Sequence, residues 1–257
     1  MRPARLTPSR DRPAVVLVAH GSRDPRAAAA TEALARAVRR AHPSWDVHAA
    51  YLDHAGPRPL DVLASLAPGR RAVLVPLLLT KAYHGRVDIP AVLAAAEDLP
   101  VSVTLAEVLG PQPGPLAAAV PVPSLLVDGL ARRLPAAGLD AVVLAAAGTR
   151  NAAARATVEW AANALSARLS LPCAVAYASA APPLPGAAVD ALRASGARRI
   201  GMAAYFLAPG HLYDLAADSA RTAGAVTIAT PLTDAPELVR LVAARVGAVA
   251  SPASAAA

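Results

Sequence analysis

The sequence predicts an α/β protein made of two similar, doubly wound parallel-sheet domains that derive from an internal duplication and face each other across an inter-domain cleft. Three observations predict this fold class. Short apolar runs alternate with alanine-rich helical stretches, which is typical of a parallel sheet covered by helices on both faces. Polar residues follow the ends of several apolar runs. The pattern of the first half also returns in the second half.

The first half of the chain is expected to form four strands with helices between them. The strands are expected over residues 14–19, 46–52, 72–79 and 101–108, where short runs of apolar residues are bounded by turn-formers. The helices are expected over residues 27–41, 57–66, from 88 onward, and 124–134, with Asp88 as an N-cap. A sheet of order 2-1-3-4 would place the ends of the first and third strands side by side.

The second half repeats three landmarks of the first. Ala147, Tyr177 and His211 follow His20, Tyr51 and His84 by 127, 126 and 127 residues. An offset this steady indicates a duplication. We therefore expect a catalytic half over residues 13–135 and a degenerate repeat over 136–249, with disordered tails over 1–12 and 250–257.

Three side chains that follow predicted strands of the first half offer metal ligands. His20, Asp53 and His84 would meet at one edge of a sheet with the expected order. Imidazole and carboxylate groups suit Co²⁺, Fe²⁺ or Ni²⁺, and neutral imidazole accepts protons near neutral pH. The second half has Ala147 and Ser179 at the first two equivalent positions. The sequence therefore places the chemistry in the first half.

Each histidine also has a structural interpretation. His20 could be a turn residue, and His84 could cap a helix, but their joint placement with Asp53 favours a functional role. His48 and His54 lie on the opposite strand parity from Asp53 and are assigned to packing or to a supporting role.

Two further histidines lie outside this group. His42 is expected at the surface, at the end of a helix. His211 is either a vestige of the duplication or the far wall of the cleft.

Composition argues against several classes of protein. The net charge is +7, yet the arginines are scattered and aromatic residues make up 3% of the chain, which disfavours nucleic acid as a partner. Neither a dinucleotide fingerprint, a P-loop nor a hydrolase elbow motif occurs. No apolar run approaches the ~20 residues of a membrane helix, and no targeting segment is visible. Cys173 is alone, which excludes an internal disulfide and fits a reducing compartment, so we expect a cytoplasmic protein.

The motifs VLVAHGSRDPRA and LVPLLLTKAYHGRVDIP closely resemble those of the sirohydrochlorin chelatases, the ATP-independent class II family that inserts Co²⁺ or Fe²⁺ into sirohydrochlorin. The second half, with YFLAPGHLYD, resembles the degenerate repeat of the long, two-domain members. The resemblance implies a lyase of cobalamin or siroheme biosynthesis in which His20 and His84 bind the metal and accept the pyrrole protons. The assisting acid is usually glutamate in the family, whereas the matching residue here is the shorter Asp53.

The resemblance also implies an acidic tetrapyrrole as substrate, with the divalent metal as co-substrate and no nucleotide. A basic cleft would attract the carboxylates of such a ring. The expected substrate-binding residues are Ser22, Arg23, Lys81, Tyr83, Arg86 and His211, with Arg26, Arg58 and Arg150 as further cleft arginines. No nucleic acid or membrane is expected as a partner, and the protein is expected to be a monomer with pseudo-twofold symmetry. The alternative is a tetrapyrrole or metal carrier that kept the fold without turnover.

Overall fold

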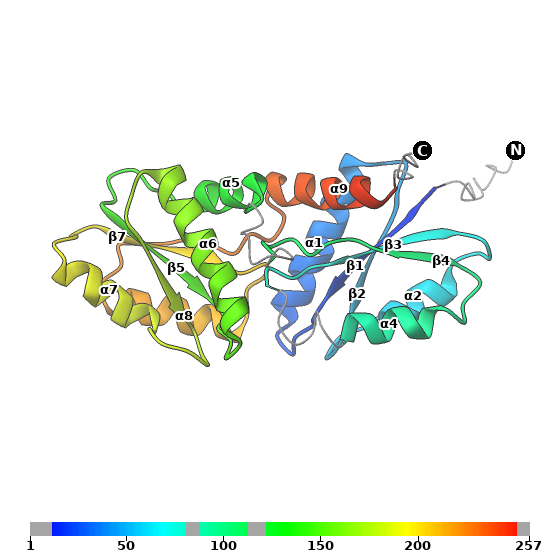
Figure 1. The fold of residues 1–257 in the computed structure, drawn as a ribbon, viewed down its shortest axis with the longest axis horizontal. Helices are drawn as coiled ribbons and strands as arrows, with labels where there is room; N and C mark the ends of the chain where they lie inside the picture. The colour runs from blue at the N-terminus through cyan, green and yellow to red at the C-terminus, as the bar shows by residue number, and fades with distance from the viewer. Residues whose placement is uncertain (1–11, 81–87, 113–121, 251–257) are drawn as a thin grey trace, which may run out of the picture.

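A computed structural model describes residues 12–80, 88–112 and 122–250 of the chain. These residues form two four-stranded parallel sheets, of order β2-β1-β3-β4 and β6-β5-β7-β8, which lie side by side in Figure 1. The first sheet contains β1 (Ala14–Ala19), β2 (Asp46–Tyr51), β3 (Arg71–Pro76) and β4 (Ser102–Leu105). The second contains β5 (Ala141–Ala146), β6 (Cys173–Tyr177), β7 (Ile200–Tyr205) and β8 (Thr227–Ile228). The identical orders confirm the predicted doubly wound fold and its duplication.

Helices connect successive strands, as parallel pairing requires. In the first half they are α1 (Pro25–Ala41), α2 (Pro59–Ser65) and α4 (Asp88–Ala96). Further along the chain they are α5 (Ser124–Arg133), α6 (Ala152–Leu169), α7 (Pro185–Ala194), α8 (His211–Thr222) and α9 (Pro236–Ala250). Among the described residues, no helix is both long and apolar enough to cross a bilayer.

The boundaries of two elements differ from the sequence-based prediction for reasons visible in the backbone. The third strand was expected to reach Leu79 but ends at Pro76, because the Leu78 N–H bonds back to the Pro76 carbonyl at 2.9 Å. Leu77 and Leu79 remain buried outside the strand. The first helix begins two residues earlier than expected, at Pro25, because the Asp24 side chain accepts a hydrogen bond from the Arg26 N–H and caps it.

The structure also differs from the sequence-based prediction in smaller details. The second strand and second helix are each slightly shorter than expected, and β4 covers four residues rather than the whole run 101–108. Asp88 is the first described residue of α4 and lies in its first turn; the residue before it lies outside the described residues, so the role of Asp88 as the N-cap stays a prediction. Cys173 opens β6 and is partly buried.

The helices that end each half are exchanged between the two sheets. Although α5 follows the first sheet in the chain, it packs against α6 and β7, whereas α9 packs against α1 and β3. In Figure 1 the C-terminal helix α9 accordingly lies beside the strands of the first half. Arg245 of α9 donates a hydrogen bond to the Val108 carbonyl at 2.9 Å. Helix 124–134, expected to complete the first half, therefore covers the second sheet.

The strand residues of the first sheet divide between two cores by the two-residue period of a strand. Ala14, Val16 and Val18 of β1 join Leu63 and Leu74 in a small cluster on the side of α2 and α4. The alternate residues of β1, Val15 and Leu17, belong to a larger cluster that continues through the second half of the chain. Burying each large aliphatic side chain stabilises the fold by about 1.5–3 kcal/mol. This shared core joins the two halves.

Candidate active site

The loops that follow β1 and β5 have the same backbone arrangement in both halves. Gly21 and Gly148 have φ values of 95° and 100°, which favour glycine. A Cβ atom on Gly21 would lie 1.7 Å from the Asp53 carbonyl oxygen, and one on Gly148 would lie 1.9 Å from that of Ser179. In each half, glycine therefore lets the loop after the first strand touch the loop after the second.

Backbone hydrogen bonds fix the same contact. The Asp53 N–H donates to the His20 carbonyl at 2.8 Å, and the Ser179 N–H donates to that of Ala147 at 3.1 Å. The loop places a histidine beside an aspartate in the first half, and an alanine beside a serine in the second. The predicted pairing of His20 with Asp53 is thus present, and the backbone that holds it is common to both halves.

The Asp53 carboxylate lies in a positively charged neighbourhood. The backbone N–H of His54 donates to it at 2.8 Å and lowers the pKa of Asp53. The Arg58 guanidinium lowers it further, as do His54 and His20 when their rings are protonated. The Asp53 carboxylate therefore remains ionised at neutral pH, close to two imidazole rings.

His54 is a member of this group that the strand-parity argument missed. Its ring centre lies 6.4 Å from that of His20, and the two rings meet edge to face at 80°. Strand parity does not apply to His54, because β2 already ends at Tyr51. The sequence could have identified His54 because it lies beyond the end of the predicted strand, and a residue in a loop need not follow the alternation of the strand.

A cavity of about 430 Å³ lies between the two halves, a size common for small-molecule sites. Its wall comes from the carboxyl ends of β1, β3, β5 and β7 and from the start of α8. The described lining residues are His20, Leu77, Leu78, Leu79, Thr80, Ala146, Ala147, Gly148, Thr149, Val158, Tyr177, Tyr205, Phe206, Leu207 and Leu212. This confirms the predicted cleft between facing strand ends. Its described wall is mainly apolar, and none of these residues is arginine.

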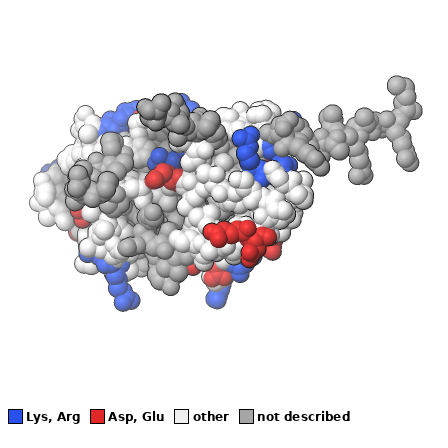
Figure 2. All heavy atoms as spheres, turned by 45° about the vertical axis from the view of Figure 1, so that its right-hand side comes forward, with Lys and Arg blue, Asp and Glu red and all other residues white. Residues whose placement is uncertain are grey.

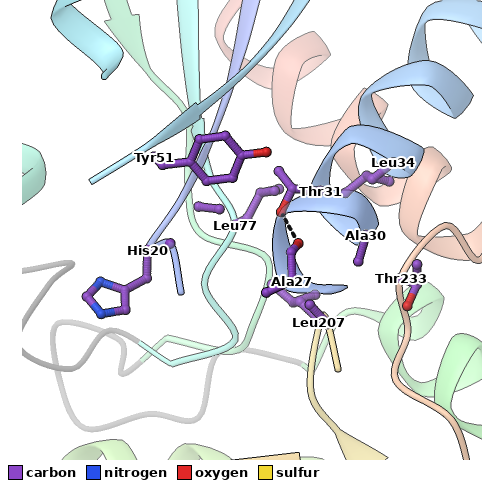
Figure 3. Close-up of a pocket in the computed structure, with 12 residues that line it drawn as sticks. His20, Ala27, Ala30, Thr31, Leu34, Tyr51, Leu77, Leu207 and Thr233 are labelled. Atoms are coloured by element: carbon purple, nitrogen blue, oxygen red, sulfur yellow. Dashed lines mark hydrogen bonds between the residues drawn. The ribbon is translucent and has the colours of Figure 1, made fainter. Parts of the chain in front are cut away.

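His20 also borders a smaller cavity of about 170 Å³ against α1. In Figure 3 the His20 ring points away from Leu34, Ala30 and Thr233, which line that smaller cavity. The imidazole is partly exposed. His20 thus stands at the border between the apolar interior and the larger cavity.

Two interactions join the halves near the strand ends. The buried Tyr205 hydroxyl donates to the Leu79 carbonyl at 3.0 Å. The Arg26 guanidinium lies 2.5 Å from Asp24 and 2.6 Å from Asp214 of α8, and these carboxylates raise the pKa of Arg26. Arg26, expected among the cleft arginines, is therefore engaged in an ion-pair bridge between the halves.

The remaining predicted site residues divide into two groups. Ser22 accepts the Asp24 N–H at 3.1 Å, whereas Arg23 and His211, the first residue of α8, are exposed. The second group, Lys81, Tyr83, His84 and Arg86, lies outside the described residues, so its members stay predictions. Within the described ranges, no three His, Cys, Asp or Glu side chains are placed to hold a metal ion together.

The other histidines and arginines named from the sequence have clear surroundings. His42 stacks on Trp45 at the end of α1, with ring centres 4.1 Å apart. His48 lies 2.9 Å from Asp46, within β2. Arg58 lies 3.7 Å from Asp53, and Arg150 is exposed. On the face drawn in Figure 2, the described basic side chains form separate groups among acidic and uncharged ones.

The chain was compared with curated proteins and with solved structures. No curated protein matches the chain. SirB from Bacillus subtilis, solved with Fe³⁺, is 19% identical, with a TM-score of 0.71 over 92% of this chain and 94% of that chain. The sirohydrochlorin chelatase SirB from Bacillus subtilis subspecies spizizenii, in complex with cobalt, gives 19% identity and a TM-score of 0.70 over 92% and 94%.

A third solved structure is CbiX, described as the terminal enzyme for biosynthesis of siroheme in denitrifying bacteria. It is 21% identical, with a TM-score of 0.64 over 93% of this chain and 100% of that chain. These likenesses confirm the chelatase-like, two-domain fold. The model of the CbiX family matches residues 14–120 and again residues 141–249. The chain therefore belongs to the CbiX family and contains one family repeat in each half.

Proposed function

We propose that this protein is a sirohydrochlorin chelatase, a metal chelatase of the lyase class that inserts Co²⁺ or Fe²⁺ into sirohydrochlorin for cobalamin or siroheme biosynthesis. One observation carries the proposal. His20 stands at the carboxyl end of β1 on the wall of the cavity between the halves, beside Asp53, while the equivalent backbone in the second half presents Ala147 and Ser179. The loop geometry that the two halves share thus supports a ligand-bearing residue in one half alone.

The proposed chemistry needs neutral imidazole. Insertion of a divalent cation displaces pyrrole N–H protons, and a neutral histidine that faces the ring accepts them. In this proposal His20 and His84 bind the metal and take these protons, and Asp53 assists. The ionised Asp53 carboxylate favours a cation in its neighbourhood, because it adds negative charge next to the imidazoles.

The apolar lining of the cavity suits the faces of a flat ring. Its described wall includes Leu77, Tyr205 and Phe206, which suit the faces of a macrocycle. The ring carboxylates would then lie toward solvent, and the exposed arginines that could meet them are Arg150, which follows the lining residue Thr149, and Arg23, which lies three residues after His20. Two chelatases of the same fold were solved with Fe³⁺ and with cobalt, and we extend these metals to the present chain.

The deciding experiment mixes purified protein with sirohydrochlorin and Co²⁺, Fe²⁺ or Ni²⁺ in turn and follows the absorbance of the macrocycle. Insertion faster than the rate without protein, with many turnovers for each protein molecule, is the expected result. Tight binding of sirohydrochlorin without any acceleration would contradict the proposal and favour the carrier alternative. His42→Ala is the matched control, because His42 stacks on Trp45 at the end of α1.

A further inference from the structure

His54 is the one described histidine that accompanies His20 at the strand ends. Their ring centres are 6.4 Å apart. The His54 Nε2 atom lies 3.4 Å from the Asp53 Oδ2 atom, and the His54 backbone N–H donates to Asp53 Oδ1 at 2.8 Å. The His54 side chain is 34% exposed, so it adds little to the core. Two imidazoles and a carboxylate therefore gather beyond the carboxyl ends of β1 and β2, and the one of them that lines the cavity between the halves is His20.

The backbone at this position does not require histidine. His54 has a φ value of 58°, a left-handed conformation that is uncommon for most non-glycine residues, although histidine is among the residues enriched in it. Its equivalent in the second half is Ala180, which has a φ value of 64°. The loop thus needs the left-handed conformation in both halves, and alanine satisfies it. The imidazole of His54 is an addition to the first half, like His20 and Asp53.

The two rings need a small movement to share a cation. A metal ion about 2.1 Å from one nitrogen of each ring, at a tetrahedral angle, requires ring centres roughly 5 Å apart. The observed separation is 6.4 Å. His54 and Asp53 are both partly exposed loop residues, so a small joint shift of their side chains, which keeps the contact between them, can close the difference without moving a strand.

We infer that His54 is a further metal ligand of this chain, held in place by Asp53, and this inference rests on the proposed function. The Asp53 carboxylate faces one ring nitrogen of His54, which leaves the other nitrogen for the cation. Carboxylates that hold a ligand histidine in this way fix its ring orientation and strengthen it as a donor. Asp53 thus acts on the metal through His54, and its short side chain suffices for that role.

The test measures Co²⁺ alone, without a tetrapyrrole. Titration of the full-length protein, followed by the visible spectrum of bound Co²⁺, should show that His54→Ala weakens binding about tenfold or more and changes the spectrum. Ala180 shows that alanine fits the equivalent backbone, and His54→Asn provides a second variant that tolerates the left-handed conformation. His42→Ala and Ala180→His should both bind Co²⁺ like the wild type.

A double-mutant cycle separates a positioning role of Asp53 from direct ligation. Asp53→Asn should weaken Co²⁺ binding in the wild-type background but cause no further loss in the His54→Ala background. Additive losses would show that Asp53 contacts the metal by itself and would overturn its assigned role.

Other outcomes address the two proposals separately. Wild-type affinity and spectrum in His54→Ala, or a wild-type protein that binds no Co²⁺, would overturn the inference about His54. Binding of Co²⁺ through His54 in a protein that inserts no metal into sirohydrochlorin would refute the proposed function and leave this inference standing.

Discussion

Replacing Gly21 and Gly148 with alanine, one at a time, tests whether the two halves have the same loop conformation while the first half alone carries the catalytic residues. Both glycines occupy the loop after the first strand of their half, with φ values of 95° and 100°. An added Cβ atom would lie 1.7 Å from the Asp53 oxygen or 1.9 Å from the Ser179 oxygen. The neighbouring loop must retreat until the contact exceeds 3.0 Å, below which Cβ contacts are essentially never seen.

The expected loss of stability is similar in the two variants. Alanine in the left-handed region costs about 1–2 kcal/mol. The displacement of the neighbouring loop also disrupts the backbone hydrogen bond from Asp53 to His20 or the one from Ser179 to Ala147. Each such hydrogen bond contributes about 0.5–1.5 kcal/mol to stability. We therefore expect the free energy of unfolding, measured by urea denaturation, to fall by about 2–3 kcal/mol in each case.

The effects on function should differ. Gly21→Ala forces the Asp53 backbone and the Gly21 loop apart by more than 1 Å, and a misplacement of that size costs about 100-fold in rate when it affects reacting groups. Gly148→Ala displaces Ser179, which carries no ligand in the proposed site. Insertion rates and Co²⁺ affinity are compared at a temperature where circular dichroism shows both variants to be folded.

Equal losses of insertion in Gly21→Ala and Gly148→Ala would show that the second half contributes to catalysis as much as the first. Full stability in both variants would show that the loops yield without cost, which would refute the reasoning from the close backbone approach.

Three further predictions concern single side chains. His20→Ala should abolish metal insertion in the absorbance assay, whereas His211→Ala should cost much less, and equal losses would place the site across both halves. Tyr205→Phe leaves the Leu79 carbonyl without its described partner across the halves and should lower the free energy of unfolding in urea by about 1–3 kcal/mol; an unchanged midpoint would show that this bond does not stabilise the fold. The Arg26 guanidinium hydrogen-bonds to Asp24 and lowers the pKa of this carboxyl. The Asp24 carboxylate therefore stabilises the fold at pH values above its pKa in the unfolded chain, about 3.9, and this stabilisation is lost as the pH falls through its lower pKa in the folded protein. The stability difference between wild type and Asp24→Asn should accordingly shrink below about pH 4, and a difference independent of pH would contradict this.

Several features of the site follow from local patterns. The apolar runs that form β1, β3, β5 and β7 predicted buried parallel strands, and the polar residues after them predicted a ligand site at their carboxyl ends. The steady offset between His20 and Ala147, and between Tyr51 and Tyr177, predicted two facing halves. Hydrophobic periodicity and repetition carry this information because the alternation of buried and exposed positions is a local property of the chain.

Other features depend on contacts between distant residues. The apolar run through Leu77 and Leu79 predicted a longer strand, yet these side chains are buried in the cavity wall after β3 has ended. The strand β3 ends because the chain turns at Pro76. An apolar pattern reports burial but not the hydrogen bonds of the backbone, so it could not distinguish these two arrangements.

The sequence by itself determined the fold class, the order of the strands, the duplication and the placement of His20 beside Asp53, because each follows from periodicity, spacing or the rules of parallel sheets. Only the tertiary structure decided that α5 and α9 are exchanged between the sheets and that His54 meets His20. An amphipathic helix specifies that it needs an apolar partner but not which sheet supplies it. The conformation of the loop that carries His54 depends on the approach of Gly21 to Asp53, a contact between segments far apart in the chain.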